Sequence, residues 1–270
     1  MRCGRRPGGW NKAVQKCASC HHVRTRWLIE GQAYRCAQGR LCDWLDRRTI
    51  ELAVAQSGGQ RISVAEIRRI AESITNGHAM AMAWVDYAKE RPQTGQELRS
   101  LACYLHGLIF EEAGLVFAGR LRTPADPEVF VDAGRHQVRG IAAPDLDQAI
   151  SKVMDDARAR LFSENASELA RGCAILLEGL FRAHPFLDGN GRVGRLLVRL
   201  YVRRSGQFQI RDFDTTGKSG RRYLGGLRHA RKVIRETGGP PRDPFGLLAR
   251  WVEGHIVVDD LLEHMDDLAE

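Results

Sequence analysis

The sequence has no apolar run long enough to cross a bilayer, and no apolar core of a secretory signal follows its charged N-terminus. We therefore expect a cytoplasmic protein with no membrane-spanning segment. Internal repeats and low-complexity tracts are also absent, which excludes a solenoid of repeated units. Of the 270 residues, 43% are hydrophobic and 27% are charged, a composition that supports one large packed domain and a small appendage.

Cysteine is scarce beyond residue 42. Cys103 and Cys173 lie there in apolar helical stretches, where we expect small buried side chains. The other cysteines cluster near the N-terminus, at Cys3, Cys17, Cys20, Cys36 and Cys42. Because cytoplasmic proteins rarely form disulfides, this cluster predicts a structural Zn²⁺ site with Cys17, Cys20, Cys36 and Cys42 as candidate ligands. The wide spacing of Cys36 and Cys42 departs from the usual pattern, so His21, His22 and Cys3 stay open as substitutes.

Positive charge exceeds negative charge, with a formal net charge of +8. Such a surplus favours anionic partners: nucleotides, nucleic acid or an acidic protein. Arginine far outnumbers lysine, however, and a GC-rich genome alone would produce the same bias. Basic residues interleaved with Trp10, Trp27 and Tyr34 leave nucleic-acid binding by the N-terminal segment open as an alternative.

The chain divides into four predicted parts. These are a cysteine-rich, turn-rich head (1–45), a helix and linker (46–64), a large helical domain (65–255) and a helical tail (256–270). Apolar periodicity predicts helices in the large domain at 98–117, 145–161, 168–183, 192–205 and 221–236. The predicted fold class is therefore all-α, a helical bundle with the small cysteine-rich segment in front of it.

Two local features accompany this helical pattern. Residues 128–132 and 137–141 flank a glycine turn and predict a short β-hairpin. Upstream, Ser63 and Glu66 have the spacing of a capping box and begin a helix, for which Gly77 is the predicted stop.

The segment from His184 to Arg195, HPFLDGNGRVGR, concentrates the candidate chemistry. Pro185 cannot continue a helix, so the chain turns after His184. The glycines that follow permit positive φ and let backbone amides converge on an anion at the start of the next helix. Arg192 and Arg195 lie on one face of that helix. Asp188 is the lone carboxylate that Mg²⁺ commonly needs beside phosphate oxygens.

This segment resembles, at every position, the signature H-P-F-x-D/E-G-N-G-R-x-x-R of Fic-domain proteins. The resemblance implies a Fic-type bundle with a hairpin flap, and transfer of AMP from ATP to a Ser, Thr or Tyr hydroxyl of a target protein with release of pyrophosphate. It implies His184 as the general base and Asp188 as the Mg²⁺ ligand. It also implies a nucleotide site formed by Phe186, Gly189, Asn190, Gly191, Arg192 and Arg195.

The resemblance covers about residues 65–255. Tyr104–Phe110 and the G-x-x-R of Gly119–Arg122 resemble the helix and flap entry of the family. The hairpin at 128–141 lies where family members dock a target peptide by strand addition. Arg221, Tyr223 and Leu227 resemble the downstream R-x-Y-x-x-A-L helix.

One departure concerns inhibition. Many family members carry an inhibitory helix, S/T-x-x-x-E-G/N, whose glutamate pairs with the second signature arginine. Residues 70–77 resemble this helix, but Glu72 replaces the hydroxyl residue and Asn76 replaces the glutamate. Residues 249–254 keep a glutamate, Glu253, without the hydroxyl residue. An uncharged Asn76 cannot pair with Arg195, so we expect weak or lost inhibition in cis, or inhibition by a separate antitoxin chain.

Other interpretations remain. Gly189-x-Gly191-x-x-Gly194 matches a dinucleotide fingerprint, but a helical pattern rather than a strand precedes it. Two alternatives stay open: a Fic-scaffold toxin or regulator with another nucleotide or phosphoryl substrate, and a zinc-dependent nucleic-acid-binding regulator.

Overall fold

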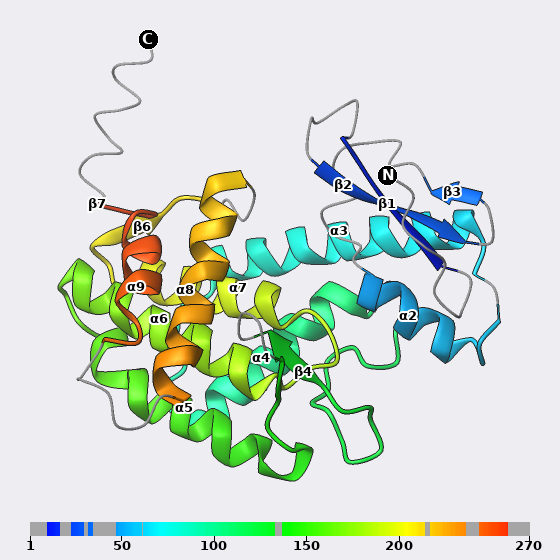
Figure 1. The fold of residues 1–270 in the computed structure, drawn as a ribbon. Coiled ribbons are helices and arrows are strands. Elements are labelled where there is room, and N and C mark those ends of the chain that lie inside the picture. The colour runs from blue at the N-terminus through cyan, green and yellow to red at the C-terminus, as the bar shows by residue number, and fades with distance from the viewer. Residues whose placement is uncertain are drawn as a thin grey trace. The chain divides into compact units, whose positions relative to one another are not determined.

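The computed structural model describes residues 10–16, 23–29, 32–34, 47–60, 62–132, 137–213, 217–235 and 243–258. Most of these residues are helical, as the sequence predicts (Figure 1). The chain forms two compact units, one of residues 1–79 with 109–118 and one of residues 80–108 with 119–270. No helix within the described ranges combines the length and the apolar character needed to cross a membrane.

The first unit begins with a three-stranded antiparallel sheet that the sequence analysis missed. Strand β1 (Trp10–Lys16) pairs with β2 (Val23–Ile29), and β2 pairs with β3 (Gln32–Tyr34). The fold is therefore mainly helical rather than all-α, and the head is not simply turn-rich. An alternating V-R-T-R-W pattern in β2 was the available signal. The candidate zinc ligands Cys17, Cys20, Cys36 and Cys42 lie outside the described residues.

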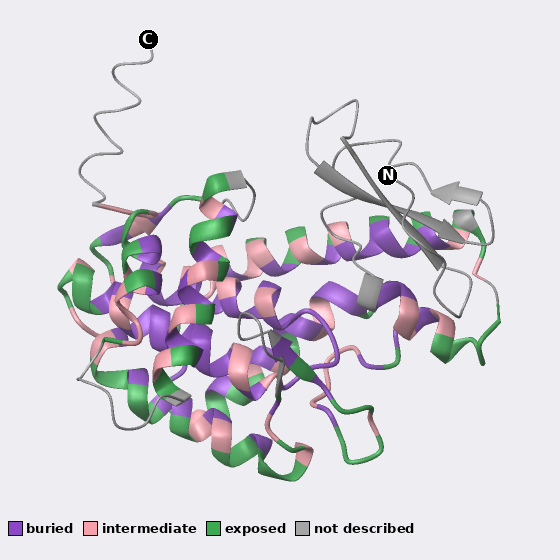
Figure 2. Ribbon diagram, viewed as in Figure 1, coloured by how far each residue is buried: buried purple, intermediate pink, exposed green. Residues whose placement is uncertain are grey.

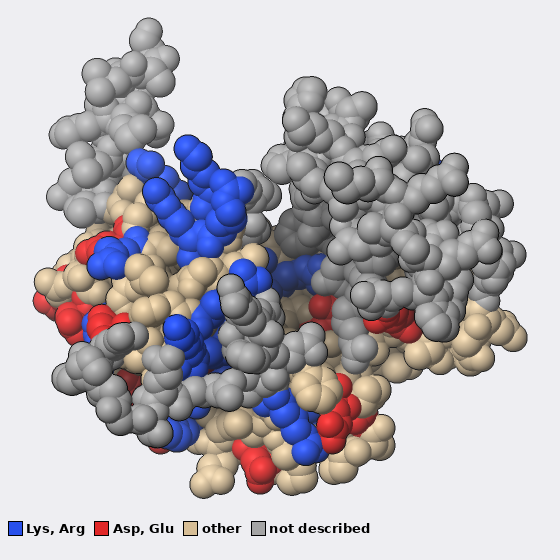
Figure 3. Space-filling view, in the orientation of Figure 1, with Lys and Arg blue, Asp and Glu red and all other residues tan. Residues whose placement is uncertain are grey.

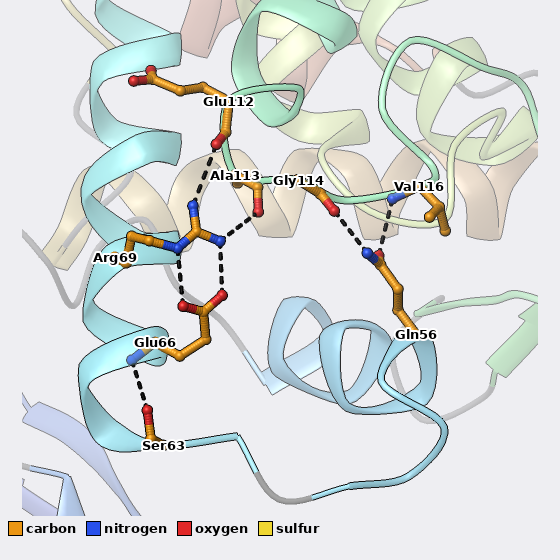
Figure 4. A network of polar contacts seen from close by, with 8 residues as sticks. All are labelled: Gln56, Ser63, Glu66, Arg69, Glu112, Ala113, Gly114 and Val116. Carbon is orange, nitrogen blue, oxygen red and sulfur yellow. Dashed lines mark hydrogen bonds and ion pairs between the residues drawn. The ribbon is translucent and has the colours of Figure 1, made fainter.

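Helix α2 (Arg47–Gln56) is anchored to the turn after α4 (Gly95–Phe110) by one amide side chain (Figure 4). The Nε2 atom of Gln56 donates to the carbonyl of Gly114 at 2.7 Å, and its Oε1 atom accepts from the N–H of Val116 at 3.0 Å. Gly114 itself has φ of 71°, which a glycine adopts without strain. This reversal explains why α4 stops well before residue 117, where the predicted helix was to end.

Helix α3 (Val64–Tyr87) starts as predicted, since the N–H of Glu66 donates to Ser63 Oγ at 3.1 Å. The carboxylate of Glu66 pairs with Arg69. The guanidinium of Arg69 also donates to the carbonyl of Ala113 (Figure 4). The predicted stop at Gly77 is wrong, because the helix continues for ten residues beyond it. A glycine inside a helix costs about 1 kcal/mol, which the burial of later apolar side chains on α3 offsets.

The second unit is a helical core with a flap. Helix α4 (Gly95–Phe110) enters it from a cap in which Thr94 and Glu97 exchange hydrogen bonds. The predicted hairpin is confirmed as β4 (Phe130–Asp132) and β5 (Gln137–Arg139), with Phe130 opposite Arg139.

Helix α6 (Ala166–Ala183) is the central element of this core, and most of its residues are buried (Figure 2). It packs closely against α5 (Leu146–Leu161) because two of its glycines face that helix. A Cβ atom at Gly172 would lie 2.7 Å from the backbone nitrogen of Leu161, and one at Gly179 would lie 2.4 Å from Val153 Cγ2. Helix α6 is thereby held rigidly, and its C-terminal end is a fixed point for the loop that follows.

The remaining elements surround α6. Helices α7 (Asn190–Arg203), α8 (Gly217–Arg235) and α9 (Gly246–Glu253) contact it, and strand β6 (Phe208–Ile210) pairs with β7 (Ile256–Val258). The predicted helical tail is wrong at its start, because residues 256–258 form β7. The rest of that tail, 259–270, lies outside the described residues.

Candidate active site

The backbone places His184 at the C-terminal cap of α6. Its φ of 49° and ψ of 57° are left-handed, and its N–H donates to the carbonyl of Leu180 at 2.9 Å. Among the described non-glycine residues, only His184 has a positive φ. Pro185 explains the turn, because the helix cannot pass through it. Such strain persists only where surrounding contacts impose it, and it is typical of functional positions.

The contacts that impose this conformation come mainly from Arg122. Its buried guanidinium donates through Nε to the carbonyl of His184 at 2.6 Å and through Nη2 to the carbonyls of Ile141 and Ala183. The N–H of Arg122 donates to the carbonyl of Pro185 at 2.8 Å. Burial lowers the pKa of Arg122 from its ordinary value. One side chain thus caps α6 and ties its end to the segment that leaves the flap.

The loop after His184 is closed by an asparagine. Asn190 Oδ1 accepts from the N–H of Phe186 at 3.0 Å, and Asn190 Nδ2 donates to the carbonyl of the same residue at 2.8 Å. Asp188 Oδ1 accepts from the N–H of Gly189 at 2.6 Å. Gly189, with φ of 77°, is the N-cap of α7. The loop is therefore preformed, with backbone groups turned toward the start of a helix, where an anion is favoured.

His106 on α4 contacts the backbone of the loop through its imidazole ring. Its Nδ1 atom accepts from the N–H of Gly119 at 2.9 Å, which assigns the ring proton to Nε2, and Nε2 lies 3.1 Å from the carbonyl oxygen of Asp188. Burial lowers the pKa of His106 to about 3. The ring is therefore neutral near neutral pH, and it serves as a donor to the loop backbone rather than as an acid or a base.

The two signature arginines have different surroundings. Arg192 is buried, whereas Arg195 is half-buried and its guanidinium carbon lies 5.8 Å from the centre of the Tyr223 ring. Gly191 directly precedes Arg192, and a Cβ atom there would be 3.2 Å from Arg195 Nη1 and 3.4 Å from the ring of Phe181. A side chain at this position would press on the end of the Arg195 side chain and shift its guanidinium by a few tenths of an ångström.

A buried acid on α6 was not singled out from the sequence. Glu178 lies on α6 in the turns before His184. Burial raises the pKa of Glu178. Its Oε2 atom is 3.5 Å from Arg182 Nε. Nearby, the guanidinium of Arg231 lies over the ring of Phe181, which meets the His184 ring edge-on at 6.2 Å. The sequence signal was a single carboxylate inside the apolar run from Ala174 to Leu180.

The structure brings the predicted loop residues together, from His184 and Phe186 through Asp188 and Asn190 to Arg192 and Arg195. Tyr223 joins them from α8, and its hydroxyl is buried without a hydrogen-bond partner among the described residues. The residues of the proposed inhibitory helix, Glu72 and Asn76, are exposed on α3, and Glu253 is exposed on α9. Within the described part of the second unit, Arg195 forms no ion pair.

Residues that fit a metal ion are few. Asp188 is largely buried, with 9% of its surface exposed, and offers one carboxylate. The described ranges contain no group of three or more metal-ligating side chains. A Mg²⁺ ion that takes most of its ligands from phosphate and water needs only such a single carboxylate, so Asp188 fits that role.

The sequence and the fold were compared with known protein families and solved structures. Residues 98–202 match the sequence model of the Fic/DOC family. The N-terminal Fic domain of a VirB-translocated Bep effector protein from Bartonella quintana is 18% identical, with 76% of this chain and 90% of that chain covered and a TM-score of 0.55. The same domain with bound ADP gives 18% identity, 73% and 89% coverage and a TM-score of 0.54.

The BepC protein from Bartonella tribocorum with bound AMPPNP is 15% identical. The alignment covers 75% of this chain and 91% of that chain, with a TM-score of 0.52. At these identities the likeness concerns the fold. No curated protein matches the sequence. Residues 98–202 thus match the Fic/DOC family, and the fold of most of the chain is that of solved Fic-domain structures.

Proposed function

We propose that this protein transfers AMP from ATP to a Ser, Thr or Tyr hydroxyl of a target protein and releases pyrophosphate. The observation that carries the proposal is the placement of His184, held in a left-handed conformation directly before a preformed anion loop. The related structures with AMPPNP and ADP support a nucleotide as the ligand.

The residues around the loop fit a nucleotide. The amides of the Gly189–Gly191 segment lie at the N-terminal end of α7, where phosphate is favoured. Arg192 and Arg195 supply guanidinium groups for the β- and γ-phosphates. The buried hydroxyl of Tyr223 would lie 3.9 Å from a Cβ atom at Gly191, so an unsatisfied polar group borders the loop. A nucleotide hydroxyl or base would satisfy it.

The reaction follows from these positions. The oxygen of the target hydroxyl forms a bond to the α-phosphorus, the bond from that phosphorus to the bridging oxygen of the β-phosphate breaks, and pyrophosphate leaves. His184 takes the hydroxyl proton, a role suited to imidazole near neutral pH. A Mg²⁺ ion held by Asp188 would neutralise phosphate charge. The loop amides and the arginines do most of the work, by positioning and by charge stabilisation.

The flap is the proposed docking site for the target. Its two strands pair only with each other among the described residues, so each keeps an edge for strand addition. At its base, Gly140 donates to the carbonyl of Val129, and a Cβ atom at Gly140 would lie 3.5 Å from His184 Cβ. A peptide on this edge would therefore present its hydroxyl beside His184.

The test is transfer of label from α-labelled ATP with Mg²⁺ to proteins of a host lysate. Wild type should label a protein, and His184→Ala should not, although it should still bind ATP. His229→Ala, which changes a half-buried histidine on α8 away from the loop, is the matched control and should label normally. Loss of ATP binding in His184→Ala would overturn its assignment as the base.

A second arm with γ-labelled ATP tests phosphoryl transfer. The complete Gly-Asn-Gly-Arg sequence of the loop favours AMP transfer, because the branches of the family with other reactions generally depart from it. Label from the γ-position alone would replace the proposal with a kinase-like reaction.

A further inference from the structure

A cavity lies beside α8 and α9, and none of its lining residues belongs to the signature loop. It has a volume of about 790 Å³ and is lined by the segment after β6, by α8 and by α9 with the turn that follows it. We call it the α8–α9 pocket. The residues that matter for its chemistry are Arg211, Asp212, Arg222, Arg250, Trp251 and His255. Its volume is within the range of small-molecule sites.

Three arginines from three elements line this pocket. Arg211 follows β6, Arg222 lies on α8 and Arg250 lies on α9, and all three are exposed. Within the described ranges their side chains form no hydrogen bond and no ion pair. Some arginines of this unit do pair with carboxylates; Arg171, for example, binds Asp243 through both of its terminal nitrogens. The three guanidinium groups are therefore available to an anion.

The local charge is strongly positive. Asp212 also lines the pocket, but its Oδ1 atom accepts from Arg199 Nη1 at 2.8 Å, so its charge is already shared. Exposed Lys218 and Arg221 extend the positive surface next to Arg222, and Figure 3 shows Lys and Arg side chains gathered over this N-terminal end of α8. A concave site lined by one sign of charge concentrates ligands of the other sign.

An aromatic wall closes the pocket on one side. The buried ring of Trp251 stacks on Phe213, with centroids 5.0 Å apart, and contacts Tyr223 and His255 at 4.6 Å each. Its Nε1 atom donates to Ser219 Oγ at 3.0 Å. The indole is therefore fixed in place, and the wall beside the arginines is flat and preorganised.

We propose that the α8–α9 pocket binds a small ligand that carries two or more linked phosphates. Guanidinium groups bind phosphate oxygens in a fork geometry, and three of them from three directions match several phosphate oxygens better than one carboxylate or one phosphate. Pyrophosphate and the phosphate tail of a nucleotide share this chemistry. The proposal does not depend on the transfer reaction at His184.

The experiment is isothermal titration calorimetry of the full chain with pyrophosphate at fixed ionic strength. Four proteins are compared: wild type, Arg222→Ala/Arg250→Ala, Arg221→Ala and Arg195→Ala. Arg221 is the matched control, since it is exposed on α8 beside Arg222 but does not line the pocket. Because all changed pocket residues are exposed, the melting temperature should stay constant, which verifies folding.

We expect the double variant to weaken pyrophosphate binding about tenfold or more, because two charge-assisted contacts are lost. Arg221→Ala should leave pyrophosphate binding within about twofold of wild type. Arg195→Ala removes a proposed phosphate ligand of the signature loop, and binding at the α8–α9 pocket should persist in this variant. No binding by wild type would overturn the proposal. An equal loss in Arg221→Ala would overturn it in favour of diffuse surface attraction, and loss in Arg195→Ala alone would place the ligand at the signature loop.

An ADP titration in the Arg195→Ala background identifies the source of the phosphates. Tighter binding of ADP than of pyrophosphate, with loss in Arg222→Ala/Arg250→Ala, would assign a nucleotide whose base packs on the Trp251 side. Binding of pyrophosphate alone would assign the inorganic ligand. Either result supports the proposal that the pocket binds linked phosphates. If neither ADP nor pyrophosphate binds, the proposal is overturned.

Discussion

The imidazole ring of His106 lies parallel to the phenyl ring of Phe186, with centroids 4.1 Å apart and planes 10° apart. The same imidazole accepts from Gly119 and lies within hydrogen-bond distance of the Asp188 carbonyl. It therefore joins α4, the approach to the flap and the signature loop in one contact group. This arrangement works only while the ring is neutral, because a second ring proton would face the N–H of Gly119.

The stability of the protein should therefore depend on pH through His106. Burial lowers its pKa from 6.5 to about 3, so between these values the unfolded chain binds a proton that the folded chain does not. The free energy of unfolding then falls as the pH falls, by about 2 kcal/mol from this residue at pH 5. Urea unfolding at pH 7.5 and pH 5 measures it. His106→Gln keeps an amide donor without a titrating ring and should lose about 2 kcal/mol less than wild type, and equal losses would contradict the assignment.

The guanidinium of Arg122 should be needed for its shape as well as its charge. Arg122→Lys removes the fork that holds the carbonyls of Ile141, Ala183 and His184, and we expect a loss of about 2–4 kcal/mol of unfolding free energy. Turnover should fall more than ATP affinity, because His184 loses its orientation. Arg120→Lys is the control. That residue pairs with Asp126 nearer the surface, so we expect about 1 kcal/mol or less. Similar losses in both variants would contradict the special role of Arg122.

The signature loop could be predicted from the sequence because its interactions are local. Asn190 closes onto Phe186 four residues earlier, and the proline and glycines that shape the loop lie in the same stretch. The residues that hold the loop lie in segments that resemble the family, but the sequence did not indicate that they contact the loop. His106 and Arg122 reach it across 82 and 62 residues of sequence, and only the tertiary fold brings them there.

Helix and strand boundaries were likewise predictable only where local interactions set them. The hairpin at 130–139 was found because alternation and a glycine turn are local signals. Helix α3 passes through Gly77 because buried residues beyond it, such as Ala81 and Val85, supply tertiary packing that outweighs the local cost of glycine. The sheet at 10–34 was not predicted because its strands are short and the cysteines between the first two, Cys17 and Cys20, are typical of a metal site in a turn-rich segment.

Gly191 should be essential for binding and dispensable for stability. In Gly191→Ala the new Cβ atom meets Arg195 Nη1 at 3.2 Å, so the arginine must move. Helix propensity favours alanine by about 1 kcal/mol, and we therefore expect no loss of unfolding free energy. Calorimetry with a non-hydrolysable ATP analogue should show a dissociation constant raised several-fold. Gly107→Ala, where the nearest atom lies 3.6 Å away, is the matched control and should bind as wild type does. Unchanged affinity in Gly191→Ala would separate Arg195 from the nucleotide.

Position 76 tests whether the protein has lost inhibition in cis. Asn76 is exposed on α3, so a charged side chain there is tolerated by the fold. The inhibitory-helix interpretation of residues 70–77 predicts that Asn76→Glu lowers transfer of label from α-labelled ATP about tenfold, because the added carboxylate would compete with the nucleotide phosphates for Arg195. Asn76→Gln has the same length without the charge and should be as active as wild type. If Asn76→Glu leaves both activity and ATP affinity unchanged, residues 70–77 are not an inhibitory helix.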